Sequence, residues 1–147
     1  MTQQLLLVAH NAETIATVQK AFSQAVAQVF VARDAVEAML FLDRQPCDVV
    51  LIEVESAQPT ELALCSVIRK HWDAGVFLLL HPPALTNVVL AFRRGAEAYV
   101  SLQDLEPREL VARVLALGMR VHLSRRPGQE RRRAATSGDG LQGDSLP

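Results

Sequence analysis

Short apolar runs alternate along the chain with segments in which apolar residues recur at helical spacing. The runs predict five buried strands, at residues 5–8, 29–31, 49–52, 76–80 and 98–101. Each run is followed by apolar positions three or four residues apart, which predict a helix. Five strand–helix units in succession indicate an α/β fold, a doubly wound parallel sheet with right-handed crossovers and helices on both faces.

Residues that start and stop helices support these boundaries. Asp34 is expected to cap the second helix, with Glu37 completing a capping box, and Thr60 is expected to cap the third. The adjacent prolines at residues 82–83 delay the fourth helix, which is expected at residues 85–94 with Gly95 behind it. Pro107 suits the first position of the last helix.

Composition and charge narrow the class of protein. The 147 residues are 50% hydrophobic, and 15 Lys and Arg oppose 16 Asp and Glu for a formal net charge of −1. These values predict a folded soluble domain without the basic excess of a nucleic-acid binder. No apolar run approaches the ~20 residues of a membrane span, and no secretory signal is recognisable, so a cytoplasmic location is expected.

The composition changes near residue 124. Residues 125–133 contain five arginines, and large apolar residues are scarce from there to residue 147. Such a segment buries too little surface to offset the entropy of ordering it. We therefore expect a folded domain at residues 1–124 and a disordered tail or linker at residues 125–147. The arginines lack aromatic neighbours, which favours a linker over a nucleic-acid site.

No set of residues supports catalysis. Cys47 precedes a core strand and Cys65 falls on the inward stripe of a helix, so both are expected to be inert buried thiols. The sequence has no Ser in a Gly-flanked elbow and no Gly-rich loop after a strand. We therefore expect no enzyme, no catalytic residues and no cofactor.

Function in a sheet of this kind is expected where the strands end. His10, Glu53 and His81 lie just after or at the ends of three strands, which is a plausible arrangement for a two-histidine, one-carboxylate metal site. Histidines at strand ends are more often solvated or hydrogen-bonded, so no metal is assigned.

Several segments carry a resemblance to a known family. They are ARDAVEA at residues 32–38, CDVVLIE at residues 47–53, GAEAYV at residues 95–100 and EPREL at residues 106–110. In order and spacing they resemble the receiver (CheY-like) domains of two-component response regulators, over about residues 4–124. The resemblance implies a flavodoxin-like sheet with strand order 2-1-3-4-5, five helices and a role in signal transduction.

The residues that receivers use for phosphotransfer are replaced here. A receiver phosphorylates an aspartate after strand three, aided by an acidic pair that holds Mg²⁺, a Ser or Thr, and a Lys. The matching positions hold, in the same order, Glu53, then Ala9 and His10, then Leu80 or His81, then Leu102. Glu53 is the only carboxylate left in this motif, and the positive charge of the lysine is lost. The resemblance therefore implies a pseudo-receiver that does not depend on phosphorylation.

Glu53 leaves several interpretations open. Its negative charge, paired with His10, could hold the domain in one signalling state. Alternatively the pocket has decayed and leaves Glu53 solvated at the rim of the sheet. Two other functions also stay open: a ligand- or metal-sensing module that uses His10, Glu53 and His81, and a receiver with atypical phosphorylation.

The resemblance also implies a surface for partners. In receivers the face of helix four, strand five and helix five commonly carries dimerisation or docking. Arg94, Tyr99 and Arg113 fall on that face, with Tyr99 at the family's switch-tyrosine position. We expect a protein partner or a homodimer there, and nucleic acid only through an output domain outside this sequence. The chain is either an adaptor that acts alone or part of a longer parent.

Overall fold

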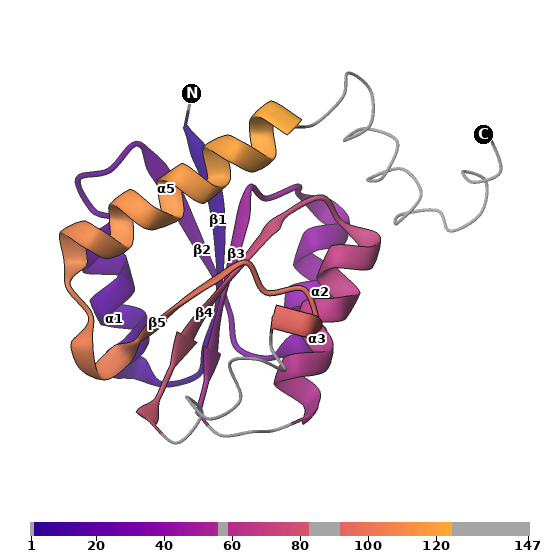
Figure 1. The fold of residues 1–147 in the computed structure, drawn as a ribbon, viewed down its shortest axis with the longest axis horizontal. Helices are drawn as coiled ribbons and strands as arrows, with labels where there is room; N and C mark the ends of the chain where they lie inside the picture. The colour runs from indigo at the N-terminus through magenta and orange to yellow at the C-terminus, as the bar shows by residue number, and fades with distance from the viewer. Residues whose placement is uncertain (1, 56–58, 83–91, 125–147) are drawn as a thin grey trace, which may run out of the picture.

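Five parallel strands form the centre of the domain, in the order β2-β1-β3-β4-β5 (Figure 1). The computed structural model describes residues 2–55, 59–82 and 92–124. The strands are β1 (Gln3–Val8), β2 (Ala27–Ala32), β3 (Val49–Val54), β4 (Gly75–Leu80) and β5 (Ala98–Ser101). The predicted fold class and strand order are confirmed.

Helices cover both faces of the sheet (Figure 1). Helices α1 (Ala12–Ala21) and α5 (Pro107–Ser124) lie on one face, and α2 (Ala35–Arg44) and α3 (Pro59–His71) on the other. A short 3₁₀ helix, η2 (Leu102–Asp104), follows β5. The predicted helix at residues 85–94 falls mostly outside the described residues. Among the described helices, none combines the length and apolar character that crossing a membrane requires.

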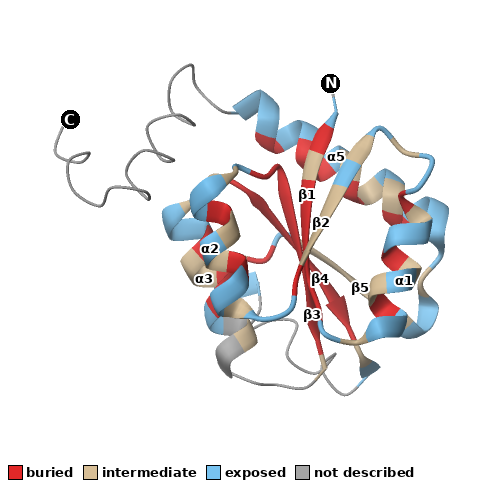
Figure 2. Cartoon of the chain, turned by 180° about the vertical axis from the view of Figure 1, so that it is seen from behind, coloured by how far each residue is buried: buried red, intermediate tan, exposed pale blue. Residues whose placement is uncertain are grey.

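The central strands are buried on both faces (Figure 2). Every residue of β3 and of β4 is buried, as in strands covered by helices on both sides. Successive side chains point to opposite faces, so Val50 and Ile52 pack toward α2 and α3, whereas Val49 and Leu51 pack toward α1 and α5. The same alternation places the side chain of Glu53 on the α1 side of the sheet.

Capping residues define most of the helix ends. Asn11 caps α1, because its side chain accepts hydrogen bonds from the backbone N–H groups of Glu13 and Thr14. Asp34 caps α2 as predicted, accepting from the backbone N–H of Glu37 at 2.8 Å. The predicted cap at Thr60 is wrong, because α3 begins at Pro59 and Thr60 lies inside the helix.

Two further predictions about the helices and the core hold. Gly95 has a φ of 113°, the left-handed conformation expected behind the end of a helix. Cys47 and Cys65 are both buried, as predicted. Burial raises the pKa of Cys65 to about 11, which keeps its sulfur in the unreactive thiol form.

Candidate functional site

The carboxylate of Glu53 is the centre of the site. Glu53 is 3% exposed and stands near the end of β3. Its Oε1 accepts hydrogen bonds from the backbone N–H groups of His10 and Asn11, at 3.2 and 3.3 Å. Its Oε2 lies 2.8 Å from the donating hydroxyl of Thr14 and 2.7 Å from Nε2 of His81. Both oxygens of this buried group are therefore bonded.

These contacts favour the ionised form of Glu53. Burial alone would raise the pKa of the carboxyl, since the charged form loses hydration. The hydrogen bonds from His81, Thr14 and the two backbone N–H groups outweigh burial, so the pKa of Glu53 lies below its ordinary value. Glu53 is thus held as an anion inside the protein.

The turn between β1 and α1 explains the backbone donors. The carboxyl ends of β1 and β3 lie side by side, since the two strands pair in parallel from Leu5 and Val49 onward. Asn11 then caps α1, and this turn directs the N–H groups of His10 and Asn11 at Glu53. The start of a helix favours a nearby negative charge, because its first N–H groups have no partner within the helix.

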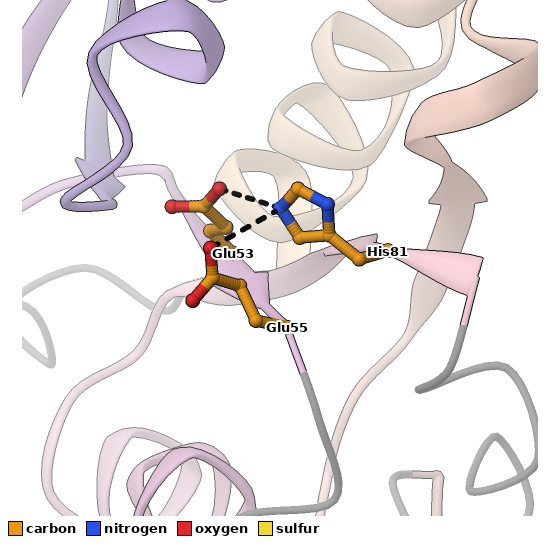
Figure 3. Close-up of side chains that lie close together, drawn as sticks. All are labelled: Glu53, Glu55 and His81. Atoms are coloured by element: carbon orange, nitrogen blue, oxygen red, sulfur yellow. Dashed lines mark hydrogen bonds and ion pairs between the residues drawn. The ribbon is translucent and has the colours of Figure 1, made fainter.

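A second carboxylate, Glu55, lies beside the first. Residues 53 and 55 are two apart on an extended chain, so their side chains point to the same side. Figure 3 shows both carboxylates directed at the ring of His81. Nε2 of His81 is 2.7 Å from Oε2 of Glu53 and 3.9 Å from Oε2 of Glu55.

His10 contacts the two carboxylates unequally. Its ring Nε2 is 3.0 Å from Oε1 of Glu55, whereas Nδ1 is 3.9 Å from Oε1 of Glu53. The side chain of His10 is 58% exposed. The expected pairing of His10 with Glu53 is therefore made mainly by the His10 backbone N–H, while the ring of His10 contacts Glu55.

A third carboxylate, Glu61, stands in the first turn of α3. It lines a hollow of about 180 Å³ together with His10, Arg33 and Glu53. Burial raises the pKa of Glu61, a hydrogen bond from the backbone of Glu55 opposes this, and the charges of Glu55 and Glu53 reinforce it. Its Oε1 is buried and has no hydrogen-bond partner among the described residues.

The remaining predicted pocket residues divide into core and rim. Ala9 and Leu80 are buried, and Leu80 packs in the cluster beneath α2 and α3, so His81 is the residue of that pair that faces the site. Leu102 is half-buried and packs toward α1 and α5. Together with Thr14 and His81, it lines a second hollow of about 320 Å³.

One expectation about this pocket is wrong. Glu53 is not solvated at the rim, because the side chain is buried and bonded on both oxygens. Glu53 is the only carboxylate at the motif positions, but Glu55 and Glu61, which lie outside the motif, are close enough to affect the same group of side chains. Thr14, Glu55 and Glu61 were missed because none of them matches a family landmark. Only the spacing of residues 53 and 55 on one strand could have indicated Glu55.

The predicted partner face is only partly free. Arg94 is exposed, and Tyr99 is half-buried with its ring centroid 5.9 Å from that of Phe92. Arg113 is engaged within the domain, because Nη2 donates to the Tyr99 carbonyl at 2.9 Å. Its guanidinium also lies 5.3 Å from the centroid of the Phe77 ring. Arg113 therefore braces α5 against β4 and β5.

The known proteins that the chain resembles in sequence include a transcriptional regulatory protein and a response regulator. No protein-family model matches the chain. It is 27% identical over 125 residues to the TorCAD operon transcriptional regulatory protein TorR of Escherichia coli O157:H7, covering 85% of this chain and 54% of that protein. It is 23% identical over 119 residues to the heme response regulator HssR of Staphylococcus saprophyticus, covering 81% of this chain and 53% of that protein. The chain thus spans about half the length of the curated relatives it matches.

Solved structures agree on the fold. A response regulator from Thermotoga maritima superimposes with a TM-score of 0.72 at 23% identity. The match covers 81% of this chain and 99% of that one. The fold of this chain therefore has a known structural counterpart.

Proposed function

We propose that this chain is a pseudo-receiver that signals without phosphorylation by binding another protein. The premise is that the chain has the receiver (CheY-like) fold and is similar in sequence to response regulators of two-component systems. The bonded state of Glu53 is the observation that carries this proposal. A phosphoacceptor must present a free carboxylate oxygen to the donor, yet both oxygens of Glu53 accept hydrogen bonds. Attack on a phosphodonor would require breaking those bonds inside a buried site.

Neither the acidic pair nor the lysine of receivers stands at its matching position in this sequence. Ala9 and His10 stand at the positions of the acidic pair, and Leu102 stands at the position of the lysine. Leu102 packs with apolar residues and supplies no charge to stabilise a phosphoryl group. Within the described residues, no Lys or Arg forms an ion pair with Glu53.

The contact between His81 and Glu53 supports a single held state over a decayed pocket. In receivers the Ser or Thr after strand four contacts the phosphoryl oxygens. Here His81 follows the fourth strand and approaches Oε2 of Glu53 to 2.7 Å. A permanent anion and its donor thus take the place of a transient phosphate and its hydroxyl partner, although a phosphate carries more charge.

The proposed partner surface centres on Arg94 and Tyr99, with the exposed Phe92 beside them. Apolar and aromatic groups next to an arginine are typical of the core of a protein interface. Arg113 has a positioning role at this surface, because it holds the Tyr99 carbonyl. The partner is a protein, either a second copy of the chain or a signalling component of the same system.

A phosphodonor tests the independence from phosphorylation. The full chain is incubated with Mg²⁺ and acetyl phosphate, and intact mass is measured before hydrolysis. We expect no phosphoryl adduct, and a variant carrying Glu53→Asp, Ala9→Asp, His10→Asp and Leu102→Lys serves to ask whether the pocket can be restored. A phosphoryl adduct on Glu53 of the unmodified chain, seen in the intact mass and lost on hydrolysis, would refute the proposal.

Charge reversal tests the surface. Binding of a partner isolated from the source cells is compared for Arg94→Glu and for Arg44→Glu, an exposed arginine at the end of α2. We expect Arg94→Glu to weaken binding at least about tenfold, as for a residue near the centre of an interface. The Arg44→Glu control should bind normally. Equal binding by both variants would show that the interface does not include Arg94.

A further inference from the structure

Three side chains at the carboxyl edge of the sheet place metal-ligating atoms together. Glu53, Glu55 and His81 each offer one ligand atom, and these atoms lie within 4.8 Å of one another (Figure 3). We propose that these residues bind a divalent first-row transition-metal ion such as Zn²⁺. The site differs from the Mg²⁺ site implied by the receiver resemblance, because Ala9 and His10 replace the acidic pair on which that site depends.

The donor set selects the kind of metal. Mg²⁺ takes oxygen ligands in near-ideal octahedral geometry, and a histidine nitrogen does not suit it. An imidazole nitrogen with two carboxylate oxygens suits Zn²⁺, Mn²⁺, Fe²⁺ or Co²⁺. The nitrogen of His81 therefore favours transition metals over the ion that receivers use.

The observed distances are close to those of a metal site. With bonds of about 2.0–2.2 Å, two ligand atoms of a tetrahedral zinc site lie about 3.3 Å apart. The His81 nitrogen is 2.7 Å from the Glu53 oxygen and 3.9 Å from the Glu55 oxygen. The two separations from the His81 nitrogen thus need to change by only about 0.6 Å to reach that geometry. The Glu53 and Glu55 oxygens lie within 4.8 Å of each other, so they need to approach by up to about 1.5 Å. Glu55 is 41% exposed at its side chain and can rotate to make the adjustment.

Surrounding groups orient the proposed ligands. Thr14 donates to the same Glu53 oxygen that faces His81, and two backbone N–H groups hold the other oxygen. Contacts of this kind around a ligand fix its orientation and strengthen metal binding. The ring of His10 lies 3.0 Å from Glu55 and is exposed enough to swing in as a fourth ligand.

A separate observation is a buried carboxylate oxygen at this edge that lacks a donor. Oε1 of Glu61 is buried without a hydrogen-bond partner among the described residues, and Glu61 lines the hollow shared with His10 and Glu53. Arg33 lines the same hollow, but in the described part of the chain the ion-pair partners of Glu53 and Glu55 are the histidines His10 and His81. A divalent cation would add positive charge beside these carboxylates.

Metal binding would also change the site. Nε2 of His81 cannot donate a proton to Glu53 and bind a metal at the same time. The direct hydrogen bond would therefore be exchanged for two bonds to the ion. A neutral His81 would then carry its ring proton on Nδ1, and a protonated His81 would also release one proton to water. This inference does not depend on the proposed partner surface, which lies around Arg94 and Tyr99.

Calorimetric titration of the full chain tests the site after removal of metals with a chelator. Zn²⁺ and Mg²⁺ are titrated separately, and Co²⁺ serves as a visible absorption probe of coordination number. We expect one Zn²⁺ per chain, much weaker Mg²⁺ binding and a four-coordinate Co²⁺ spectrum. His81→Ala and Glu55→Gln should each lower the Zn²⁺ affinity by at least about tenfold.

Matched controls separate this site from stray binding to surface histidines. His71→Ala and His122→Ala change exposed histidines on α3 and α5 and should leave the affinity unchanged. Glu55→Gln alters a partly exposed residue after β3, so it keeps the test decisive if His81→Ala fails to fold. Absent Zn²⁺ binding, equal affinity for Mg²⁺, or binding that only the control variants weaken would overturn the proposal. Since the phosphodonor and charge-reversal tests use other readouts, failure here leaves the proposed function standing.

Discussion

Glu53 at the end of β3 and Glu61 at the start of α3 are two carboxylates that share one hollow and yet behave oppositely. Both carboxyl groups lose hydration on folding, and this loss by itself would raise the pKa of each. Glu53 meets a histidine, a hydroxyl and two backbone N–H groups, and its pKa falls. Glu61 keeps one buried oxygen without a described partner, and its pKa rises.

The difference shows that donors rather than burial decide the charge at this edge. The donors of Glu53 come from the β1–α1 turn, from α1 and from the end of β4, so the fold assembles them around one position. Glu61 has one such donor, the backbone N–H of Glu55, and it faces the like charges of Glu55 and Glu53. The fold therefore stabilises the ionised carboxylate of Glu53 and destabilises that of Glu61.

Removing the charge at Glu53 should have the largest effect. Glu53→Gln keeps the shape, but its NH₂ group must face one pair of donors, so the variant should lose about 2–4 kcal/mol of unfolding free energy at neutral pH. Urea denaturation measures the loss. Glu13→Gln, on an exposed residue in the first turn of α1, is the control and should change little. Equal stability of the two variants would contradict the role of the donors.

Acidification should remove the contribution of Glu53 in the wild-type chain. Because its pKa is lowered by folding, the ionised carboxylate adds stability above the unfolded-state pKa, near 4.5. That contribution is lost as the pH falls through the lower folded-state pKa. The stability difference between wild type and Glu53→Gln, measured from pH 7 downward, should therefore shrink at acid pH. A constant difference would contradict the direction of the shift.

The two histidines should differ next. His81→Ala removes a donor to a buried anion and should lower the unfolding free energy by about 1–2 kcal/mol. His10→Ala removes an exposed ring that contacts Glu55 and should change it by less than about 0.5 kcal/mol. Thermal denaturation of both variants at one pH compares them. A larger loss for His10→Ala would contradict the assignment of His81 as the main side-chain histidine donor to Glu53.

Glu61 should give the smallest effect, with the opposite sign. A raised folded-state pKa means that the protonated form is favoured, so stability falls as the pH rises above about 4.5. Glu61→Gln should therefore stabilise the chain by up to about 1 kcal/mol at pH 7, after allowance for solvent screening, and by nothing at low pH. Denaturation at both values measures this. Destabilisation at pH 7 would show that Glu61 has a favourable partner.

The strands could be predicted more fully than the site. The apolar run at residues 76–80 differs from β4 by one residue, because fully buried parallel strands are continuous in apolar side chains. The predicted end of the third strand at residue 52 was too early, since β3 continues through Glu53 to Val54. Glutamate is disfavoured in strands, so its place there depends on tertiary contacts.

Those contacts come from distant parts of the sequence. Thr14 is 39 residues from Glu53 and His81 is 28 residues away, and no local pattern links them. The family landmarks located Glu53 and His81 but gave no sign of burial, of Thr14 or of the neighbouring Glu61. Arg113 was expected on the partner surface because of its position in the last helix. Its guanidinium instead contacts the Phe77 ring and donates to the Tyr99 carbonyl within the domain.

Carbon-13 NMR titration of the glutamate side-chain carboxyls tests most directly whether Glu53 is held as an anion. Spectra of Glu53→Gln and Glu61→Gln would assign the two signals. We predict that the pKa of Glu53 lies below the ordinary glutamate value of 4.5 and that the pKa of Glu61 lies above it. A Glu53 signal that titrates at or above that value would contradict the account.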